Sequence, residues 1–194
     1  PIEEDAEVEF AQQLAEFKNI SVTTQQLSPK TLRLLKGLML GEPLSVANFY
    51  SAKLQHKINQ LIKVKAFDYI LCSSSAVAKY VYNNNCHDKV QLLIDFMDLD
   101  SDKWQQYADK SSFVWRWVYQ RESKKLSRYE NAIQESFNAC FFIANTEVAL
   151  FKKNNPDANN VFPLGNGLNT QEFYPANIAP QNENPVFIFT GVMD

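Results

Sequence analysis

The sequence predicts an α/β protein, a Rossmann-like three-layer sandwich with a mostly parallel sheet. Four short apolar runs, each bounded by polar or turn residues, alternate with longer segments of helical periodicity. Nearly continuous hydrophobicity over a few residues is typical of strands that are buried on both faces of a parallel sheet, with crossover helices between them. The expected strands cover residues 67–72, 90–97, 140–144 and 160–165. Alternation of this kind favours right-handed crossovers.

The helices are indicated by apolar residues that recur every three or four positions. In the longest helix, Leu126, Tyr129, Ile133 and Phe137 follow this spacing and mark its core face. Ser28 is expected to cap a helix whose first residue is Pro29. The expected helices cover residues 3–18, 28–41, 45–64, 75–82, 101–109, 113–138 and 146–153, and a short β-branched strand is expected at residues 19–24.

The end of the chain has the composition of a domain boundary. Residues 170–185 contain three prolines and several Asn and Gln residues, and the apolar run "VFIF" follows them. A Pro-rich spacer before a new buried strand predicts a linker. We therefore expect a first domain at residues 1–169, an interdomain linker at 170–185 and the first strand of a second domain at 186–194. The chain is expected to be a fragment of a longer protein.

Composition restricts the class of protein. A formal net charge of −3 and a pI near 5.5 argue against a general nucleic-acid binder. Cys72 and Cys140 lie in apolar runs and are expected to be buried thiols, and the unpatterned cysteines suit a reducing cytoplasm. Cys86 and His87 provide only half of a metal site. No metal ligand set is therefore expected there.

Polar residues follow the first two strands, where ligands bind in open α/β sheets. Ser73 and Ser74 lead into a helix whose N-terminus can bind a phosphate or a sugar hydroxyl, or one serine can simply cap that helix. Asp95 and Asp98 belong to a cluster of four aspartates that can bind a divalent metal or accept hydrogen bonds from sugar hydroxyls. The alternative is that Asp100 or Ser101 caps the next helix.

The other two strand ends are polar or glycine-rich. Thr146 and Glu147 follow the third strand, and Thr146 can serve as an N-cap. Two of the five glycines, Gly165 and Gly167, flank Asn166 after the last strand. Glycine tolerates a positive φ, so "GNG" predicts a tight turn at the exit from the first domain.

Residues 113–128 mix aromatic and basic side chains in one helical segment. Such a segment can lie on an anionic membrane surface. It can equally be a helix with a solvated charged face, because its core stripe continues through the segment.

Six motifs in this order and spacing resemble the N-terminal domain of family 4 glycosyltransferases with the GT-B architecture, in particular sugar transferases associated with PEP-CTERM/exosortase exopolysaccharide loci. They are "DYILCSSSAVAKYV" (68–81), "DFMDLDSDKWQQYA" (95–108), "WVYQRESKKLSRYE" (117–130), "FFIANTEVALF" (141–151), "VFPLGNGLNTQEFYP" (161–175) and "PVFIFTGVMD" (185–194). The resemblance covers roughly residues 30–194. Asn169 stands where the family usually has an aspartate.

The resemblance implies a retaining transfer of a sugar from a nucleotide-sugar donor to an exopolysaccharide or lipid-linked acceptor, without a cofactor and often without a metal. The N-terminal domain would hold the acceptor and lack its first strands, and the fragment alone would be inactive. The residues expected to line the cleft are Ser73, Ser74, Asp95, Asp98, Thr146, Glu147, Gly165, Asn166 and Gly167, with Asp98 on sugar hydroxyls.

The expected location is cytoplasmic, with peripheral contact at the inner membrane and a homodimer both left open. Two other functions remain as alternatives. One is a non-catalytic α/β binding module that docks at a membrane surface through the basic-aromatic segment. The other is a divalent-metal hydrolase that uses the aspartate cluster.

Overall fold

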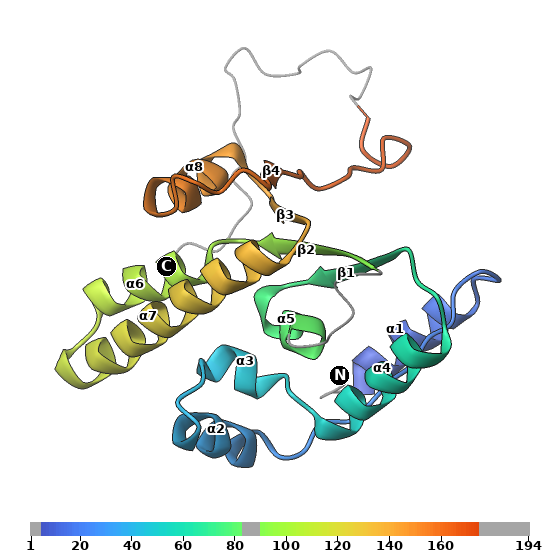
Figure 1. Ribbon diagram of the computed structural model, residues 1–194, viewed down its shortest axis with the longest axis horizontal. Helices are drawn as coiled ribbons and strands as arrows, with labels where there is room; N and C mark the ends of the chain where they lie inside the picture. Colours follow the sequence, from blue (N-terminus) through green and yellow to red (C-terminus); the bar gives the residue numbers. More distant parts are fainter. Residues whose placement is uncertain (1–4, 83–89, 175–194) are drawn as a thin grey trace, which may run out of the picture.

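The computed structural model describes residues 5–82 and 90–174 and contains a four-stranded sheet (Figure 1). The strands are β1 (Tyr69–Ser73), β2 (Gln91–Met97), β3 (Ala139–Phe142) and β4 (Val161–Pro163), in the order β1-β2-β3-β4. Every neighbouring pair is parallel. The predicted fold class, α/β and Rossmann-like with a parallel sheet, is confirmed.

Eight helices lie in the described part of the chain, and most agree with the expected ranges to within a few residues. They are α1 (Asp5–Ala15), α2 (Lys30–Met39), α3 (Leu44–Asn48), α4 (Ala52–Val64), α5 (Ser75–Tyr82), α6 (Asp100–Lys110), α7 (Phe113–Ser136) and α8 (Asn145–Asn154). No helix in the described residues is both long enough and apolar enough to span a bilayer.

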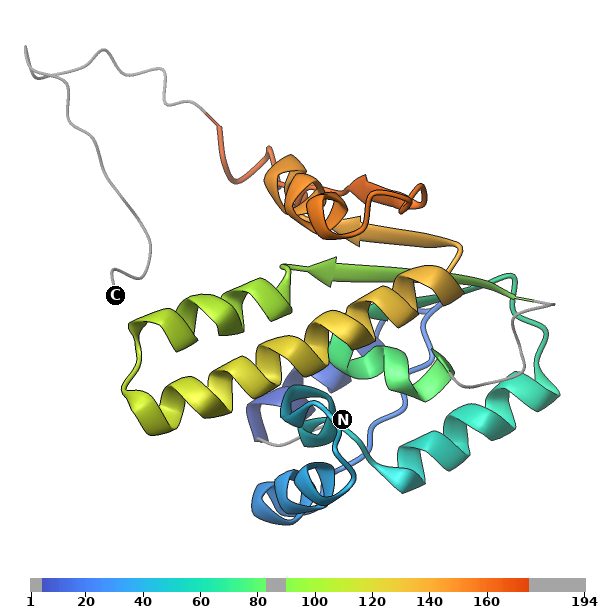
Figure 2. The same ribbon diagram turned by 60° about the vertical axis from the view of Figure 1, so that its left-hand side comes forward.

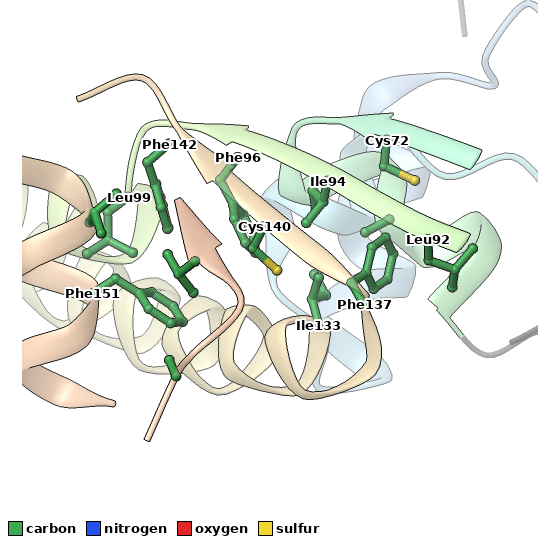
Figure 3. Packing of buried hydrophobic residues seen from close by; sticks show 14 of the residues in the cluster. Cys72, Leu92, Ile94, Phe96, Leu99, Ile133, Phe137, Cys140, Phe142 and Phe151 are labelled. Carbon is green, nitrogen blue, oxygen red and sulfur yellow. The ribbon is translucent and has the colours of Figure 1, made fainter. Parts of the chain in front are cut away.

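The connecting helices α5, α7 and α8 pack on one face of the sheet. Alternate strand residues such as Leu92, Ile94 and Phe142 are fully buried there against Ile133 of α7 and Phe151 of α8 (Figure 3). The core stripe expected in the longest helix is confirmed, since Leu126, Ile133 and Phe137 are buried and Tyr129 is half-buried. The residues that point the other way are far more open, with Tyr69 and Leu71 of β1 at 65% and 62% exposed.

α6 and α7 form a helical hairpin that extends past the ends of the strands (Figure 2). The two helices meet through aromatic rings. The ring centroid of Tyr119 on α7 lies 5.3 Å from that of Trp104 and 6.2 Å from that of Tyr107, both on α6. The C-terminal half of α7 belongs to the core, and its N-terminal half packs mainly on α6.

Three local expectations were wrong. The helix after Ser28 begins at Lys30, with Pro29 as a cap residue that has no side-chain cap bond. The carbonyl of Ser28 instead accepts a hydrogen bond from the buried Arg33 guanidinium, so the residue is held by a local contact with the first turns of α2. Residues 19–24 form no strand, and within the described residues β1 pairs with β2 alone.

The helix expected over residues 45–64 is divided between α3 and α4. The hydroxyl of Tyr80 accepts the Ser51 N–H and donates to the Phe49 carbonyl, both at 2.7 Å, which satisfies the broken backbone. Ser51 then caps α4 by accepting the Leu54 N–H at 3.4 Å. The expected strand at 186–194, most of the linker, Cys86 and His87 lie outside the described residues.

Candidate functional site

The carboxyl ends of the four parallel strands meet along one edge of the sheet, as the sequence predicted. Ser73 lies in register with Asp95 across β1 and β2, and Met97 lies in register with Phe142 across β2 and β3. β4 continues the edge, because Phe142 is also in register with Pro163. The loops that carry the expected site residues therefore leave the sheet side by side.

The serines after β1 have three different environments. Ser74 has a φ of 84°, its N–H donates to the Asp95 carbonyl at 2.7 Å, and its Oγ accepts the Ala76 N–H at 3.3 Å. It therefore caps α5, one of the two roles that the sequence left open. Ser75 is fully buried and donates to Asp100 Oδ2 at 3.1 Å. Only Ser73 has an exposed side chain at the sheet edge.

The loop after β2 turns sharply and leaves Asp98 exposed. Met97 has a φ of 66°, and the Oδ1 atom of Asp95 accepts the Met97 N–H at 3.0 Å. The strand register shifts at the same place. Asp98 makes no side-chain hydrogen bond to any residue that the structure describes, and its carboxylate is open to solvent. Asp95 thus shapes the loop, and Asp98 is free for a ligand.

The start of α6 is held by a residue that sequence reasoning missed. Neither Asp100 nor Ser101 caps this helix as expected, because its N-cap is Leu99 without a side-chain cap bond. Glu130 of α7 instead accepts the Ser101 N–H at 3.0 Å through its Oε1 atom. A glutamate 29 positions away is outside any local capping pattern, although its place on the core side of α7 was a signal.

Burial changes the acidity of the carboxyl groups under this edge. Burial raises the pKa of Glu130 to about 7, against the opposing effect of its bond to Ser101. Burial also raises the pKa of Asp100, and the Ser75 hydroxyl lowers it in part. Glu130 therefore holds a proton near neutral pH more readily than an ordinary glutamate, and both acids support the loops from below, whereas Asp98 is the exposed acid.

The loop after β3 is tied to the loop after β2. Glu147 Oε2 accepts the Leu99 N–H at 2.8 Å, so Glu147 positions the segment that carries Asp98. Thr146 lies in the first turn of α8 with an exposed side chain, and the N-cap is Ala144. The N-cap role considered for Thr146 is therefore wrong.

The exit from β4 is extended where the sequence predicted a tight turn. The Leu164 N–H donates to the Phe142 carbonyl at 2.7 Å. A Cβ added to Gly165 would lie 3.9 Å from the Ile143 carbonyl oxygen. Among the described glycines only Gly41 has a positive φ. Neither Gly165 nor Gly167 thus has the positive φ that the predicted tight turn required. A Cβ added to Gly167 would meet no atom within 4 Å.

The turn lies further on and is capped by Asn169. Its Oδ1 atom accepts the Gln171 N–H at 3.1 Å, and its carbonyl accepts the Phe173 N–H at 2.9 Å. An aspartate can accept the same side-chain bond. The structure therefore gives position 169 a local role that Asn and Asp share.

No group of three or more His, Cys, Asp or Glu residues in the described ranges is arranged to hold a metal ion. The nine expected site residues lie at the four strand ends, either in the last residues of a strand, in the loop that follows or in the first turn of the next helix. Direct side-chain contacts join only some of these strand ends. Glu147 joins the loops after β2 and β3. Asp100 and Ser75, which were outside the expected set, join the loops after β1 and β2.

The fold and this edge define the class of protein as a Rossmann-like α/β domain with a polar candidate binding edge at the carboxyl ends of its strands. In comparisons with family models, with curated proteins and with solved structures, the chain matches none of them.

Proposed function

We propose that this chain is the acceptor-side domain of a retaining GT-B glycosyltransferase that moves a sugar from a nucleotide-sugar donor to an exopolysaccharide or lipid-linked acceptor. One observation carries the proposal. Polar loops after four successive strands lie along one sheet edge, and the Asp98 carboxylate is exposed there with no partner among the described residues. Of the six sequence motifs that resemble family 4 glycosyltransferases, the five between residues 68 and 174 fall on these loops and on the elements next to them, and the sixth lies outside the described residues.

The loop residues have different roles in this proposal. Asp98 accepts hydrogen bonds from hydroxyls of the acceptor, because a free carboxylate is an acceptor-only group. Ser73 is a second contact from the neighbouring strand end. Ser74 and Glu147 are positioning residues, since their side chains are already bonded to backbone N–H groups. The donor site would be formed by a second domain after the linker.

The test is a transfer assay on the parent protein with nucleotide sugars and a lipid-linked acceptor. Asp98→Ala should raise the KM for the acceptor by about tenfold or more, the loss expected for hydrogen bonds to a charged group, while the KM for the donor stays the same. Asp109→Ala is the matched control, because Asp109 is an exposed aspartate on α6 that bonds only to Gln105 among the described residues.

Two results would remove parts of the proposal. Transfer by Asp98→Ala and Asp95→Ala with unchanged constants would exclude both residues from the acceptor site. Turnover by residues 1–194 alone would contradict the need for a separate donor domain. Absence of any nucleotide-sugar turnover or binding by the parent protein would favour a non-catalytic binding module.

A further inference from the structure

The tip of the α6–α7 hairpin exposes large apolar side chains at the point furthest from the sheet. Phe113, Val114 and Trp117 are 86%, 68% and 64% exposed, and the hairpin projects beyond the strands in Figure 2. Trp115 differs from them, since its ring stacks on Tyr119 at 5.9 Å. Phe113 and Trp117 are one helical turn apart and so share a face of α7.

A basic groove continues the same helix face. It has a volume of about 270 Å³ and is lined by Trp117, Gln120, Arg121, Lys124, Lys125 and Arg128. Spacings of three and four residues connect Phe113, Trp117, Gln120, Lys124 and Arg128 along the helix. The face therefore changes from aromatic at the N-terminus of α7 to cationic in its middle.

The acidic residues in this stretch offset only part of that charge. Glu122 and Glu130 are 2% and 1% exposed, and both accept hydrogen bonds from backbone N–H groups inside the protein. Glu122 also forms an ion pair with Arg121, at 3.6 Å between Oε2 and Nη1. Among the described residues, Lys124, Lys125 and Arg128 have no such acidic partner. Between residues 113 and 130, every exposed or half-buried charged side chain of α7 is an Arg or a Lys. A chain with a formal net charge of −3 thus presents one strongly positive strip.

The end of α2 adds apolar surface beside the groove. Arg121 donates to the Glu42 carbonyl at 3.2 Å, and a Cβ added to Gly41 would lie 3.6 Å from Lys125 Nζ. Just before this contact, Met39 and Leu40 are 81% and 61% exposed. The backbone that follows this exposed apolar helix end therefore lies next to Arg121 and Lys125.

We propose that the hairpin tip and the basic groove together form a docking surface for an anionic phospholipid bilayer. Phe113 and Trp117 enter the headgroup region, where aromatic rings are favoured, and the cations contact the lipid phosphates. Charge complementarity selects this occupant. An acidic protein would match the cations but would not require aromatic rings at a projecting helix end. The inference does not depend on the proposed transferase activity.

The first test uses the whole chain and vesicles of defined composition. The protein should float with vesicles of phosphatidylglycerol and phosphatidylcholine and bind vesicles of phosphatidylcholine alone much more weakly. Added salt should release it, since ions screen these contacts over about 8 Å at physiological strength. Tryptophan emission should shift to the blue when the anionic vesicles are added. Absence of binding to the anionic vesicles would overturn the proposal.

Matched variants place the contact on this surface. Lys124→Glu/Arg128→Glu should lower the partition coefficient by more than about tenfold, because each cation near an anionic surface contributes roughly a factor of five. The control Lys152→Glu/Lys153→Glu makes the same charge change in the last turn of α8. Phe113→Ser/Trp117→Ser should also reduce binding, and Val64→Ser, at a residue 84% exposed on α4, should not.

Two outcomes would decide against the surface. Equal losses for the α7 and α8 charge variants would mean that binding follows net charge alone. A wild-type dimer in light scattering that becomes monomeric in Phe113→Ser/Trp117→Ser, with no vesicle binding, would assign the tip to contact between copies of the chain. Thermal unfolding of each variant is the control for folding, and these exposed substitutions should leave the unfolding temperature unchanged.

Discussion

Glu130 Oε1 accepts a hydrogen bond from the Ser101 backbone N–H at 3.0 Å, in a place where Glu130 is only 1% exposed. Its other carboxyl oxygen has no hydrogen-bond partner among the described residues. The contact satisfies an N–H group at the start of α6, and it also places an acid where ionisation is costly. Burial accordingly raises its pKa to about 7.

The first prediction concerns pH and Glu130. The folded state holds this proton more tightly than the unfolded chain, so the free energy of unfolding should fall as pH rises from about 4.5 to about 7. Glu130→Gln should therefore be more stable than the wild type at about pH 8, by up to about 3 kcal/mol, and similar to it near pH 4.5. Urea unfolding across this window measures the difference. A difference that does not vary with pH would contradict the prediction.

The second prediction concerns Glu122, where the same Glu→Gln substitution should destabilise the protein. Its Oε2 atom accepts the Leu44 N–H, and its Oε1 atom accepts the Ser45 N–H and hydroxyl, all at 2.8 Å. Glu122→Gln replaces one of these acceptors by an NH₂ group, which leaves a backbone N–H facing a donor. We expect a loss of about 2 kcal/mol in unfolding free energy. Glu135→Gln, at an exposed position of the same helix, should change it by less than about 0.5 kcal/mol.

The third prediction concerns the contact between the end of α7 and the start of β4. Asn160 Nδ2 donates to the carbonyls of Gln134 and Phe137 at 2.9 and 2.7 Å. Asn160→Asp would place a carboxylate against these oxygens and should cost about 2–4 kcal/mol. Only the protonated acid can donate, so its pKa should rise and the loss should grow with pH. Asn159→Asp, at the exposed neighbouring residue, is the control in chemical denaturation.

The fourth prediction concerns the packing of α2 on α3. A Cβ added to Gly37 would lie 2.3 Å from the Ala47 Cβ. Gly37→Ala should lower the unfolding free energy by about 1–3 kcal/mol, even though alanine is the better helix former. Ala47→Gly in the same protein should recover part of the loss, so a double-mutant cycle should give a favourable coupling. Gly167→Ala, where the added atom meets open space, should leave stability unchanged.

The strands and the long helix were predictable because their signals are local. The apolar runs around Ile94 and Cys140 and the repeat from Leu126 to Phe137 are visible in the sequence, and they form the core. The break between α3 and α4 was not predicted, since it depends on the hydroxyl of Tyr80, 29 residues after Ser51. The serine at position 51 was nevertheless a readable N-cap signal.

For the candidate site, the location was predictable and the roles were not. The rule that loops meet at the carboxyl ends of parallel strands placed Ser73, Asp95 and Gly165 on one edge. The same rule does not tell whether a side chain bonds to a nearby backbone N–H, as Asp95 does with Met97, or makes no bond to the described residues, as is the case for Asp98. Glu130 was missed because its contact joins residues 29 positions apart.

The two glutamate contacts of α7 also bear on the order in which the protein takes shape during synthesis. Leu44 and Ser45 emerge from the ribosome long before Glu122, which is 77 positions further along from Ser45. Until that residue arrives, the first N–H groups of α3 have only water as a partner. Ser101 waits in the same way for Glu130. A nascent chain that ends before α7 should therefore hold α3 and α6 only loosely, and completion of α7 should order both helices in one late step.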